Sequence, residues 1–191
     1  MEYFKVKRRV YIMDSYNLLN KINSIISHYD DEKYWKYKGL LSDNKTSIIR
    51  RMLCLYYMKK CEAYNCASLG NRIDGGSCFK SPPFLPHGIK GIFISDKSVI
   101  GENVTIYQQV TIGVNKPNGG APVIGNNVFI GAGAKIIGEI NIGDNVKIGA
   151  NCVVHFDVPD NSIVVLDSNV VKYSNSINLC EEYHNERRFI D

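Results

Sequence analysis

The chain has 191 residues, of which 45% are hydrophobic and 22% are charged. These values are close to the globular average, so a packed core is feasible and wholesale disorder is not expected. No run of about 18 apolar residues occurs, which argues against a transmembrane helix, and the charged N-terminus lacks a signal-peptide pattern. We therefore expect a cytoplasmic protein whose six cysteines are reduced thiols, since no C-x-x-C pair is present.

The net charge of +4 conceals an asymmetry along the chain. Residues 1–90 carry 16 Lys and Arg against 8 Asp and Glu, whereas residues 91–191 carry 7 against 11. A basic front attracts anionic partners such as nucleic acid, a phosphorylated cofactor or an acidic glycan. The alternative is an ordinary solvated helical surface. We favour it, and expect no nucleic-acid partner, because no nucleic-acid-binding motif accompanies the charge.

The front of the chain, residues 1–70, predicts a small helical region. Aliphatic residues fall at helical spacing over 18–26, and a second set follows over 48–59. Residues 42–44 have the composition of a helix start, and Gly70 has that of a helix stop.

Residues 29–39, between these two patterns, are expected to form a connection or a short additional helix. Their aromatic residues Tyr34, Trp35 and Tyr37 offer an exposed stacking surface for a glycan or a base. The alternative, which we favour, is that the three rings pack on the domain that follows or on a neighbouring copy.

In the second half of the chain an aliphatic residue recurs every six positions, with one interruption. The interruption falls at Asn118, inside a segment, 115–122, that is rich in turn-forming residues. Burying an isoleucine is worth about 1.5–3 kcal/mol, so a polar residue cannot take its place cheaply, and we expect a loop that leaves the repeat. The repeat consists of Ile94, Ile100, Ile106, Ile112, Ile124, Ile130, Ile136, Ile142, Ile148 and Val154.

A second apolar set follows four residues after most of these positions, and Asn or Gly often stands between the two sets. Because Asn and Gly tolerate a left-handed backbone, each hexad is expected to be a short strand followed by a tight turn. A period of six fits neither an amphipathic helix nor an alternating strand, whereas three hexads close one triangular coil of a β-helix. Aliphatic side chains then fill the interior, so ligands must bind outside it. The second set is Val104, Val110, Val128, Ala134, Ile140, Val146, Cys152 and Val158.

His87 is the candidate catalytic residue. Pro86 before it and Gly88 after it fix an unusual backbone, which is a common setting for a displayed side chain. Imidazole titrates near neutral pH and can remove a proton from an acceptor hydroxyl as a general base. A carboxylate is needed to orient it. Asp74 lies upstream and Asp96 downstream, and both stay open as that partner.

Other chemistries fit the sequence less well. A β-helix zinc enzyme of the carbonic-anhydrase type needs three His ligands, but only His87 and His155 lie in the repeat region, so we expect no metal. A Ser–His–Asp hydrolase of the nucleophile-elbow type needs G-x-S-x-G, which is absent. Phosphate-binding P-loop and Rossmann fingerprints are absent as well.

Three ordered motifs carry a family resemblance: LPHG…GIFIS at 85–95, VTIYQQVTIG at 104–113 and IGAGAKIIG at 130–138. With them, roughly residues 70–165 resemble the hexapeptide-repeat acyltransferases, and in particular the serine O-acetyltransferase branch, which includes capsule and exopolysaccharide O-acetyltransferases. The resemblance implies a mainly β chain. The expected organisation is the helical region 1–70, a left-handed parallel β-helix over 71–171 and a C-terminal tail over 172–191.

The resemblance also implies a homotrimer that binds acetyl-CoA in a groove between neighbouring subunits. It makes His87 the base that deprotonates the acceptor hydroxyl, which then attacks the thioester directly. Asp74 lies near the place of the family's acidic partner of that histidine. The family's CoA-contacting coil positions fall on Gly113, Val114, Asn115, Ala132 and Ala150, with Lys135 and Lys147 nearby as phosphate partners.

Two departures from the family pattern bear on the acceptor. Serine-specific members carry an acidic residue where this chain has Pro86, and an Arg-His pair after the extruded loop, where 119–123 has neither. We therefore expect an acetyl-CoA-dependent O-acetyltransferase that acts on a sugar hydroxyl of a surface or capsular polysaccharide precursor. L-serine, as in cysteine biosynthesis, is the alternative acceptor. A non-catalytic β-helix scaffold is the second alternative.

Overall fold

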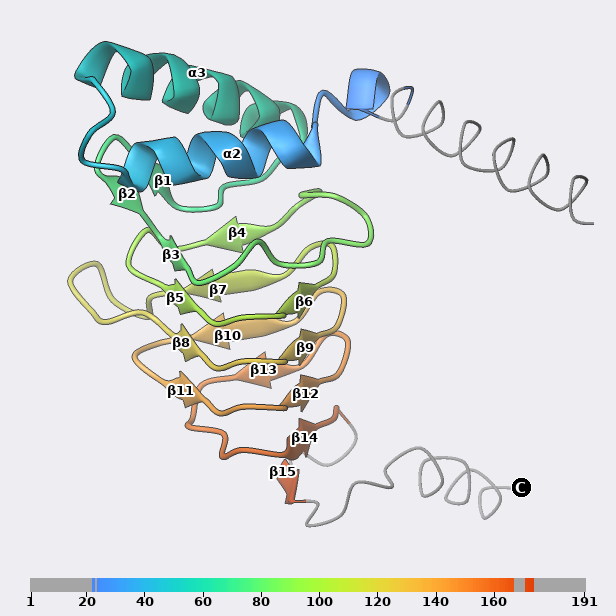
Figure 1. Cartoon of the computed structure of the whole chain (residues 1–191). Coiled ribbons are helices and arrows are strands. Elements are labelled where there is room, and N and C mark those ends of the chain that lie inside the picture. The colour runs from blue at the N-terminus through green and yellow to red at the C-terminus, as the bar shows by residue number, and fades with distance from the viewer. Residues whose placement is uncertain (1–21, 23, 167–170, 174–191) are drawn as a thin grey trace, which may run out of the picture.

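The computed structural model describes residues 22, 24–166 and 171–173. Two helices lie across one end of a stack of short strands, which are joined into successive coils (Figure 1). Leu18 and Leu19 of the expected first helix, and residues 174–191 of the expected tail, lie outside the described residues.

These two helices are α2 (Asp31–Ser42) and α3 (Ile48–Tyr64), and a short helical segment at 24–27, within the first expected helix, precedes them. Asp30 begins α2, because its side chain accepts a hydrogen bond from the Lys33 N–H. Ser47 caps α3 in the same way, satisfying a backbone donor that the helix itself cannot pair. The additional helix expected between residues 29 and 39 is therefore confirmed as α2.

Two expected helix boundaries were wrong. Residues 42–44 do not begin α3 but end α2, and the N–H of Asp43 bonds to the Gly39 carbonyl at 3.1 Å. Gly70 does not stop α3, which ends at Tyr64, where the side chain of Asn65 turns back onto the Cys61 carbonyl at 2.9 Å. A backbone hydrogen bond thus closes the end of α2, whereas a capping side chain closes the end of α3 five residues before Gly70.

The aromatic residues of α2 pack inward. Tyr34 is fully buried, and the Trp35 ring meets the Phe79 ring edge-on, with centroids 4.9 Å apart. Tyr37 meets Tyr57 of α3 at 5.1 Å in the same geometry. Packing on the first coil is thus confirmed for Trp35, whereas Tyr37 packs on α3, and the three rings do not form an exposed stacking surface.

A buried carboxylate joins the helices to the coils. Glu62 of α3 is 2% exposed, and its Oε1 accepts hydrogen bonds from the Tyr34 hydroxyl at 2.8 Å, the Leu69 N–H at 3.0 Å and the Asn71 amide. The ammonium of Lys59 pairs with its Oε2 at 2.9 Å. Such a charge is tolerated in a low-dielectric interior only because every partner is present.

Lys38 of α2 makes a second polar connection to the chain that leads into the coils. Its ammonium donates to the Gly75 carbonyl at 2.8 Å and to the Ser77 hydroxyl at 3.0 Å. Burial lowers the pKa of Lys38 to about 8, because desolvation disfavours its charged form.

The coils form a left-handed parallel β-helix with three faces. It follows a short antiparallel hairpin of β1 (Asn71–Arg72) and β2 (Gly75–Gly76). The chain then visits the first, second and third face in turn, once per coil. The first face holds β3 (Cys78–Phe79), β5 (Val99–Ile100), β8 (Val123–Ile124) and β11 (Asn141–Ile142). The second face holds β6 (Thr105–Ile106), β9 (Phe129–Ile130), β12 (Lys147–Ile148), β14 (Ser162–Val164) and β15 (Val171–Tyr173). The third face holds β4 (Phe93–Ile94), β7 (Thr111–Gly113), β10 (Lys135–Ile137) and β13 (Val153–Val154).

Strands of one face pair in parallel with the strands one coil above and below, apart from β15, which runs antiparallel to β14. β15 also crosses the boundary expected between residues 171 and 172. In the described part of the chain, no helix is long and apolar enough to cross a bilayer.

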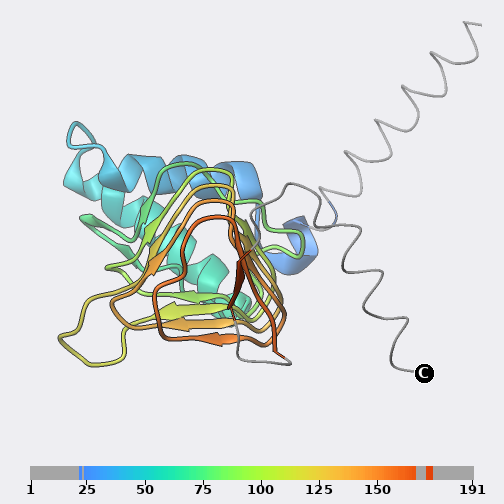
Figure 2. The same cartoon turned by 90° about the horizontal axis from the view of Figure 1, so that it is seen from below.

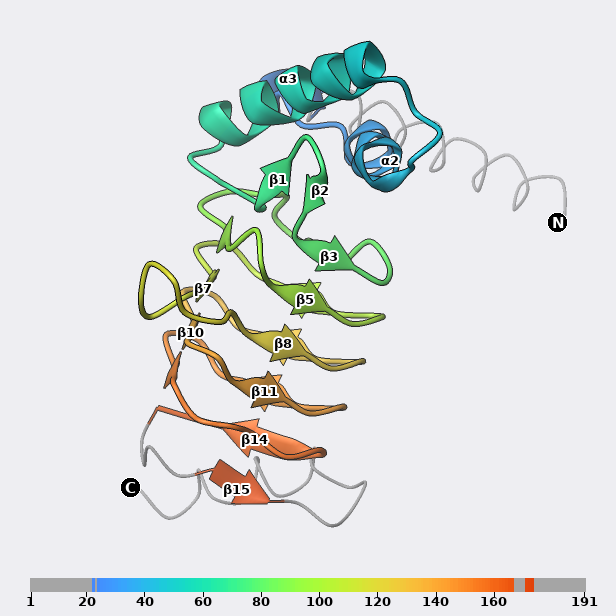
Figure 3. The same ribbon diagram turned by 90° about the vertical axis from the view of Figure 1, so that its left-hand side faces the viewer.

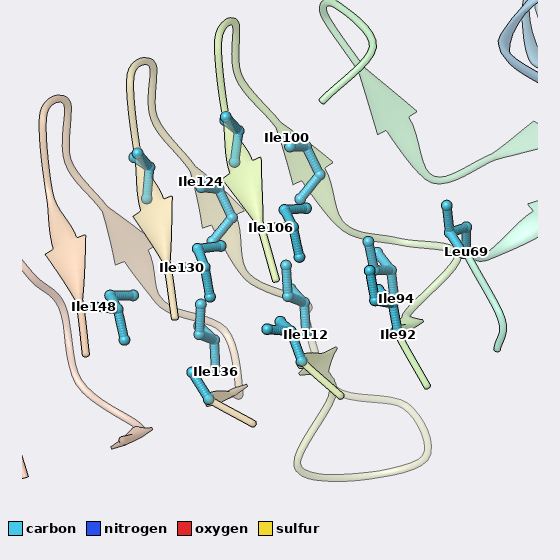
Figure 4. Close-up of a cluster of buried hydrophobic side chains, with 14 of the residues drawn as sticks. Leu69, Ile92, Ile94, Ile100, Ile106, Ile112, Ile124, Ile130, Ile136 and Ile148 are labelled. Carbon is cyan, nitrogen blue, oxygen red and sulfur yellow. The ribbon is translucent and has the colours of Figure 1, made fainter. Parts of the chain in front are cut away.

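The aliphatic repeat forms the core of the β-helix, as the sequence predicted. Equivalent residues stand in register, so that Ile94, Ile112, Ile136 and Val154 form one column on the third face. All ten repeat residues are at most 4% exposed, and Figure 4 shows the isoleucines stacked in the interior. The second apolar set is buried too. Stacking therefore leaves the outer faces and the corners as the surfaces where a ligand can bind.

The tight turns carry the residues that the pattern predicted. At the corner between the first and second faces, Asn103, Asn127 and Asn145 have positive φ values of 54°, 56° and 58°, and Asn161, which lies beyond the predicted repeat, has 56°. Their amides form a ladder of hydrogen bonds of 3.3, 3.2 and 3.1 Å from one coil to the next. Gln109, with φ of 63°, occupies a similar position that the sequence did not reveal.

The interruption of the repeat is a loop, as expected. Residues 115–122 leave the stack between β7 and β8, at the corner between the third and first faces, and project beyond the coils seen in Figure 2. The length of the insertion follows from the spacing of the asparagine ladder. Asn103 and Asn127, on either side of the loop, are 24 residues apart, whereas Asn127 and Asn145, in coils without a loop, are 18 residues apart. The loop therefore adds six residues without disturbing the register of the coils.

Candidate active site

His87 lies on the first coil, at the corner between the second and third faces. Phe84 before it bridges to Thr105 of the second face, and β4 of the third face follows it. The N–H of Gly88 bonds to the Leu85 carbonyl at 3.0 Å, and Gly88 has φ of 66°, which closes a tight turn that L residues rarely adopt. The imidazole is exposed. A rigid corner thus presents a proton-accepting side chain to solvent.

Aromatic rings continue from His87 along the second face. The Tyr107 ring meets the His87 ring edge-on, with centroids 5.8 Å apart, and the Phe129 ring lies 5.3 Å from that of Tyr107. Phe129 is 39% exposed and Phe84, on the same face, is 67% exposed. We call these four residues the aromatic strip. Sequence reasoning did not assign Tyr107 a role, although it directly follows the buried Ile106 and so had to lie outside the core.

The candidate carboxylates lie near a different corner. Arg72 donates to Asp74 at 3.2 Å and to Asp96 at 2.9 Å, and Asp96 lies between β4 and β5, where the third face meets the first. The hydrogen bond from Arg72 holds the pKa of the Asp96 carboxyl below its ordinary value. Within one chain, the structure therefore brings Asp74 and Asp96 to Arg72, whereas His87 lies one corner away.

Two of the expected CoA-contacting positions stack beneath the His87 corner. Ala132 and Ala150 occupy the same corner in successive coils, where the N–H of Asn151 bonds to the Ala132 carbonyl at 2.8 Å. A side chain at Gly131 would come within 2.6 Å of the Ala150 backbone, so the coils are in close contact here. Because the side chains of Ala132 and Ala150 are small, they project little from this corner.

The other expected positions are divided between the third and second faces. Gly113 ends β7, and Val114 and Asn115 lead into the 115–122 loop, at the corner beside Asp96. Lys135 lies on the third face. Its ammonium donates to the Gln109 carbonyl at 2.6 Å, back toward the His87 corner.

Lys147 stands apart from these residues, since it lies on the second face, in register with Phe129 of the aromatic strip. We call the corner between the second and third faces the His87 corner, and the corner between the third and first faces, where the 115–122 loop leaves the stack, the loop corner. In a single chain the third face separates these two corners. Among residues 22, 24–166 and 171–173, no cluster of His, Cys, Asp or Glu is suited to hold a metal ion.

A family model describes the centre of this β-helix. Residues 121–155 match the bacterial transferase hexapeptide model, which comprises six repeats. These residues run from the end of the extruded loop through β13, and include Ala132, Lys135, Lys147 and Ala150. The matched region is thus the part of the aliphatic repeat that follows the loop, from Ile124 to Val154.

The chain is similar to serine acetyltransferases over a longer stretch. It is 36% identical over 154 residues to the serine acetyltransferase of Staphylococcus aureus strain Mu50, an alignment that covers 79% of this chain and 65% of that protein. It is 35% identical, with the same coverage, to that of Staphylococcus epidermidis strain ATCC 35984. The chain thus spans just under two thirds of the length of these curated relatives.

Solved structures of serine acetyltransferases share the fold. The Neisseria gonorrhoeae enzyme superposes with a TM-score of 0.58 and 29% identity, covering 70% of this chain and 50% of that one. The soybean apoenzyme superposes with a TM-score of 0.55 and 32% identity, covering 64% and 50%. These likenesses agree with a left-handed β-helix that follows a small N-terminal helical region.

Proposed function

We propose that this protein is an acetyl-CoA-dependent O-acetyltransferase in which His87 is the general base. The observation that carries the proposal is the exposed imidazole of His87, held at a tight corner of a hexapeptide β-helix. The similarity to serine acetyltransferases supports the same reaction class. A solid aliphatic core excludes an internal site, which favours chemistry at such a corner.

The reaction is a direct transfer. His87 accepts the proton of the acceptor hydroxyl as the oxygen attacks the thioester carbonyl of acetyl-CoA. The new C–O bond forms and the C–S bond breaks. The CoA thiolate leaves, and the imidazolium returns the proton to its sulfur. No covalent enzyme intermediate is required.

A groove for acetyl-CoA is proposed along the His87 corner and the third face. The small side chains of Ala132 and Ala150 leave room for the extended arm of acetyl-CoA, and Lys135 offers a cation beside them. Gly113, Val114 and Asn115 form the far edge of that face, and Lys147 extends the cationic surface onto the second face.

A homotrimer is part of this proposal. The His87 corner and the loop corner lie at opposite edges of the third face, so one chain alone leaves the site open. A neighbouring copy that sets its loop corner against the His87 corner would close the groove. The same arrangement would bring Asp74 of one subunit near His87 of the next, where it could orient the imidazole.

L-serine is the first acceptor to consider, because the relatives named above are serine acetyltransferases. They favour this alternative over the sugar acceptor that the sequence departures suggested. A sugar hydroxyl stays as the second candidate on one observation. Within the aromatic strip, the half-buried ring of Tyr107 and the exposed ring of Phe129 lie next to His87 and suit the apolar face of a pyranose.

The test is thioester cleavage of acetyl-CoA, measured with L-serine and with a panel of hexoses as acceptors. His87→Ala is expected to lower kcat by about 10²–10⁴-fold, the usual contribution of a general base. Lys80→Ala is the control, because Lys80 is an exposed residue of the same coil and lies at the corner between the first and second faces, away from the proposed groove. An unchanged rate for His87→Ala would remove this residue from the mechanism.

A further inference from the structure

One side of α3 is apolar and faces away from the rest of the described residues. Ile49, Met52, Leu53 and Tyr56 follow the spacing of a single helical face, and they are 69%, 57%, 65% and 71% exposed. We call these four residues the cap face. Isolated exposed apolar residues are ordinary, but a contiguous set on one helix indicates an interaction surface.

The opposite side of α3 already supplies the packing that holds the helix in place. Cys54, Met58 and Cys61 are at most 4% exposed and belong to the core cluster. The cap face is therefore surplus to folding, and among the described residues nothing packs over it.

The exposed charges on α3 itself are all positive, and the exposed carboxylate of Asp43 lies in the turn before the helix. Lys45, Arg50 and Lys60 are exposed, and residues 44–66 contain a single acidic residue, Glu62. Glu62 is buried and already paired with Lys59. The surface of α3 thus combines exposed aliphatic and aromatic side chains with cations, the composition of helices that lie in the interface of an anionic membrane.

The place of α3 in the fold suits such a surface. The helix lies at the extreme end of the molecule and across the coil stack, so that its outer side faces away from the β-helix (Figures 1 and 3). It is therefore free to lie flat against a plane without obstructing the His87 corner, which is on the first coil beneath it.

We propose that the cap face docks this protein on a lipid surface that carries anionic headgroups. The apolar side chains enter the boundary of the acyl chains while Lys45, Arg50 and Lys60 approach the headgroup charges. A second copy of the same face is a poorer occupant, because a face-to-face pairing would bring the cations Arg50 and Lys60 of the two copies together. The proposal is independent of the acceptor and of the acetyl-transfer step.

The experiment is co-sedimentation of the full chain with vesicles of phosphatidylglycerol and phosphatidylcholine, compared with vesicles of phosphatidylcholine alone. Binding is expected to the anionic vesicles only, and to weaken as salt shortens the screening length. Lys60→Glu changes the charge by two units and should weaken binding about 30-fold, since each cation near such a surface contributes about fivefold. Lys80→Glu is the matched control, an exposed lysine on the coils that should bind like wild type.

The apolar part of the surface is tested separately. Leu53→Ser should weaken vesicle binding several-fold, whereas Leu166→Ser, at a leucine that is 58% exposed near the other end of the stack, should not. Thermal melting checks that both variants are folded. The proposal is overturned if Leu53→Ser and Lys60→Glu bind vesicles as wild type does. It is also overturned if Leu53→Ser halves the mass of the wild-type particle in sedimentation, since the cap face would then join two copies.

Discussion

The inward and outward sides of each rung can be separated by one pair of substitutions in β13. Val153 and Val154 are adjacent and identical in type, but Val153 is 59% exposed on the third face and Val154 is fully buried beneath Ile136. Val154→Ala removes two carbons from the core, worth about 1.6 kcal/mol at 0.8 kcal/mol each. The cavity left behind adds to this, for a total of about 2–3 kcal/mol. Val153→Ala should cost less than about 1 kcal/mol.

The assay is urea unfolding followed by circular dichroism, with both variants at the same protein concentration as wild type. The expected result is a lower midpoint for Val154→Ala with an unchanged slope, because stability alone has changed. Equal losses for the two variants, or a larger loss for Val153→Ala, would refute the assignment of alternate residues to the core and the surface.

Three other substitutions probe the remaining parts of the fold. Ile130→Asp places an unpaired charge in the middle of the stack and should abolish the folded state, so a soluble variant with a wild-type melting curve would contradict its burial. Lys38 has a folded-state pKa of about 8 and an ordinary value of 10.5, so the unfolded state binds more protons between these pH values and stability should rise by about 3 kcal/mol over that window. Lys38→Met should remove this rise from urea unfolding measured at pH 7.5 and 10, and an identical pH dependence in both proteins would count against the burial of the ammonium. Glu62→Ala should cost about 3–5 kcal/mol in thermal unfolding because it strands the buried Tyr34 hydroxyl and Leu69 N–H, while Glu32→Ala, at an exposed position on α2, should cost little.

The sequence alone determined the coils, because the β-helix is built from local and repeated rules. A buried aliphatic residue every sixth position and an Asn or Gly at many of the corners specify one rung at a time. Ile94 through Val154 and the asparagine ladder followed these rules, and the polar Asn118 correctly marked the loop.

Only the tertiary structure decided which residues share a corner of the β-helix. His87 and Asp74 are 13 positions apart in the sequence, yet the closing of the first coil sends them to different corners, and Arg72 pairs with Asp74. The helix ends depended on side chains such as Ser47 and Asn65 that found backbone partners after folding. The cap face of α3, which no described residue covers, could not be separated from a core stripe by spacing, since both follow the helical period. Only packing shows which side of the helix is covered.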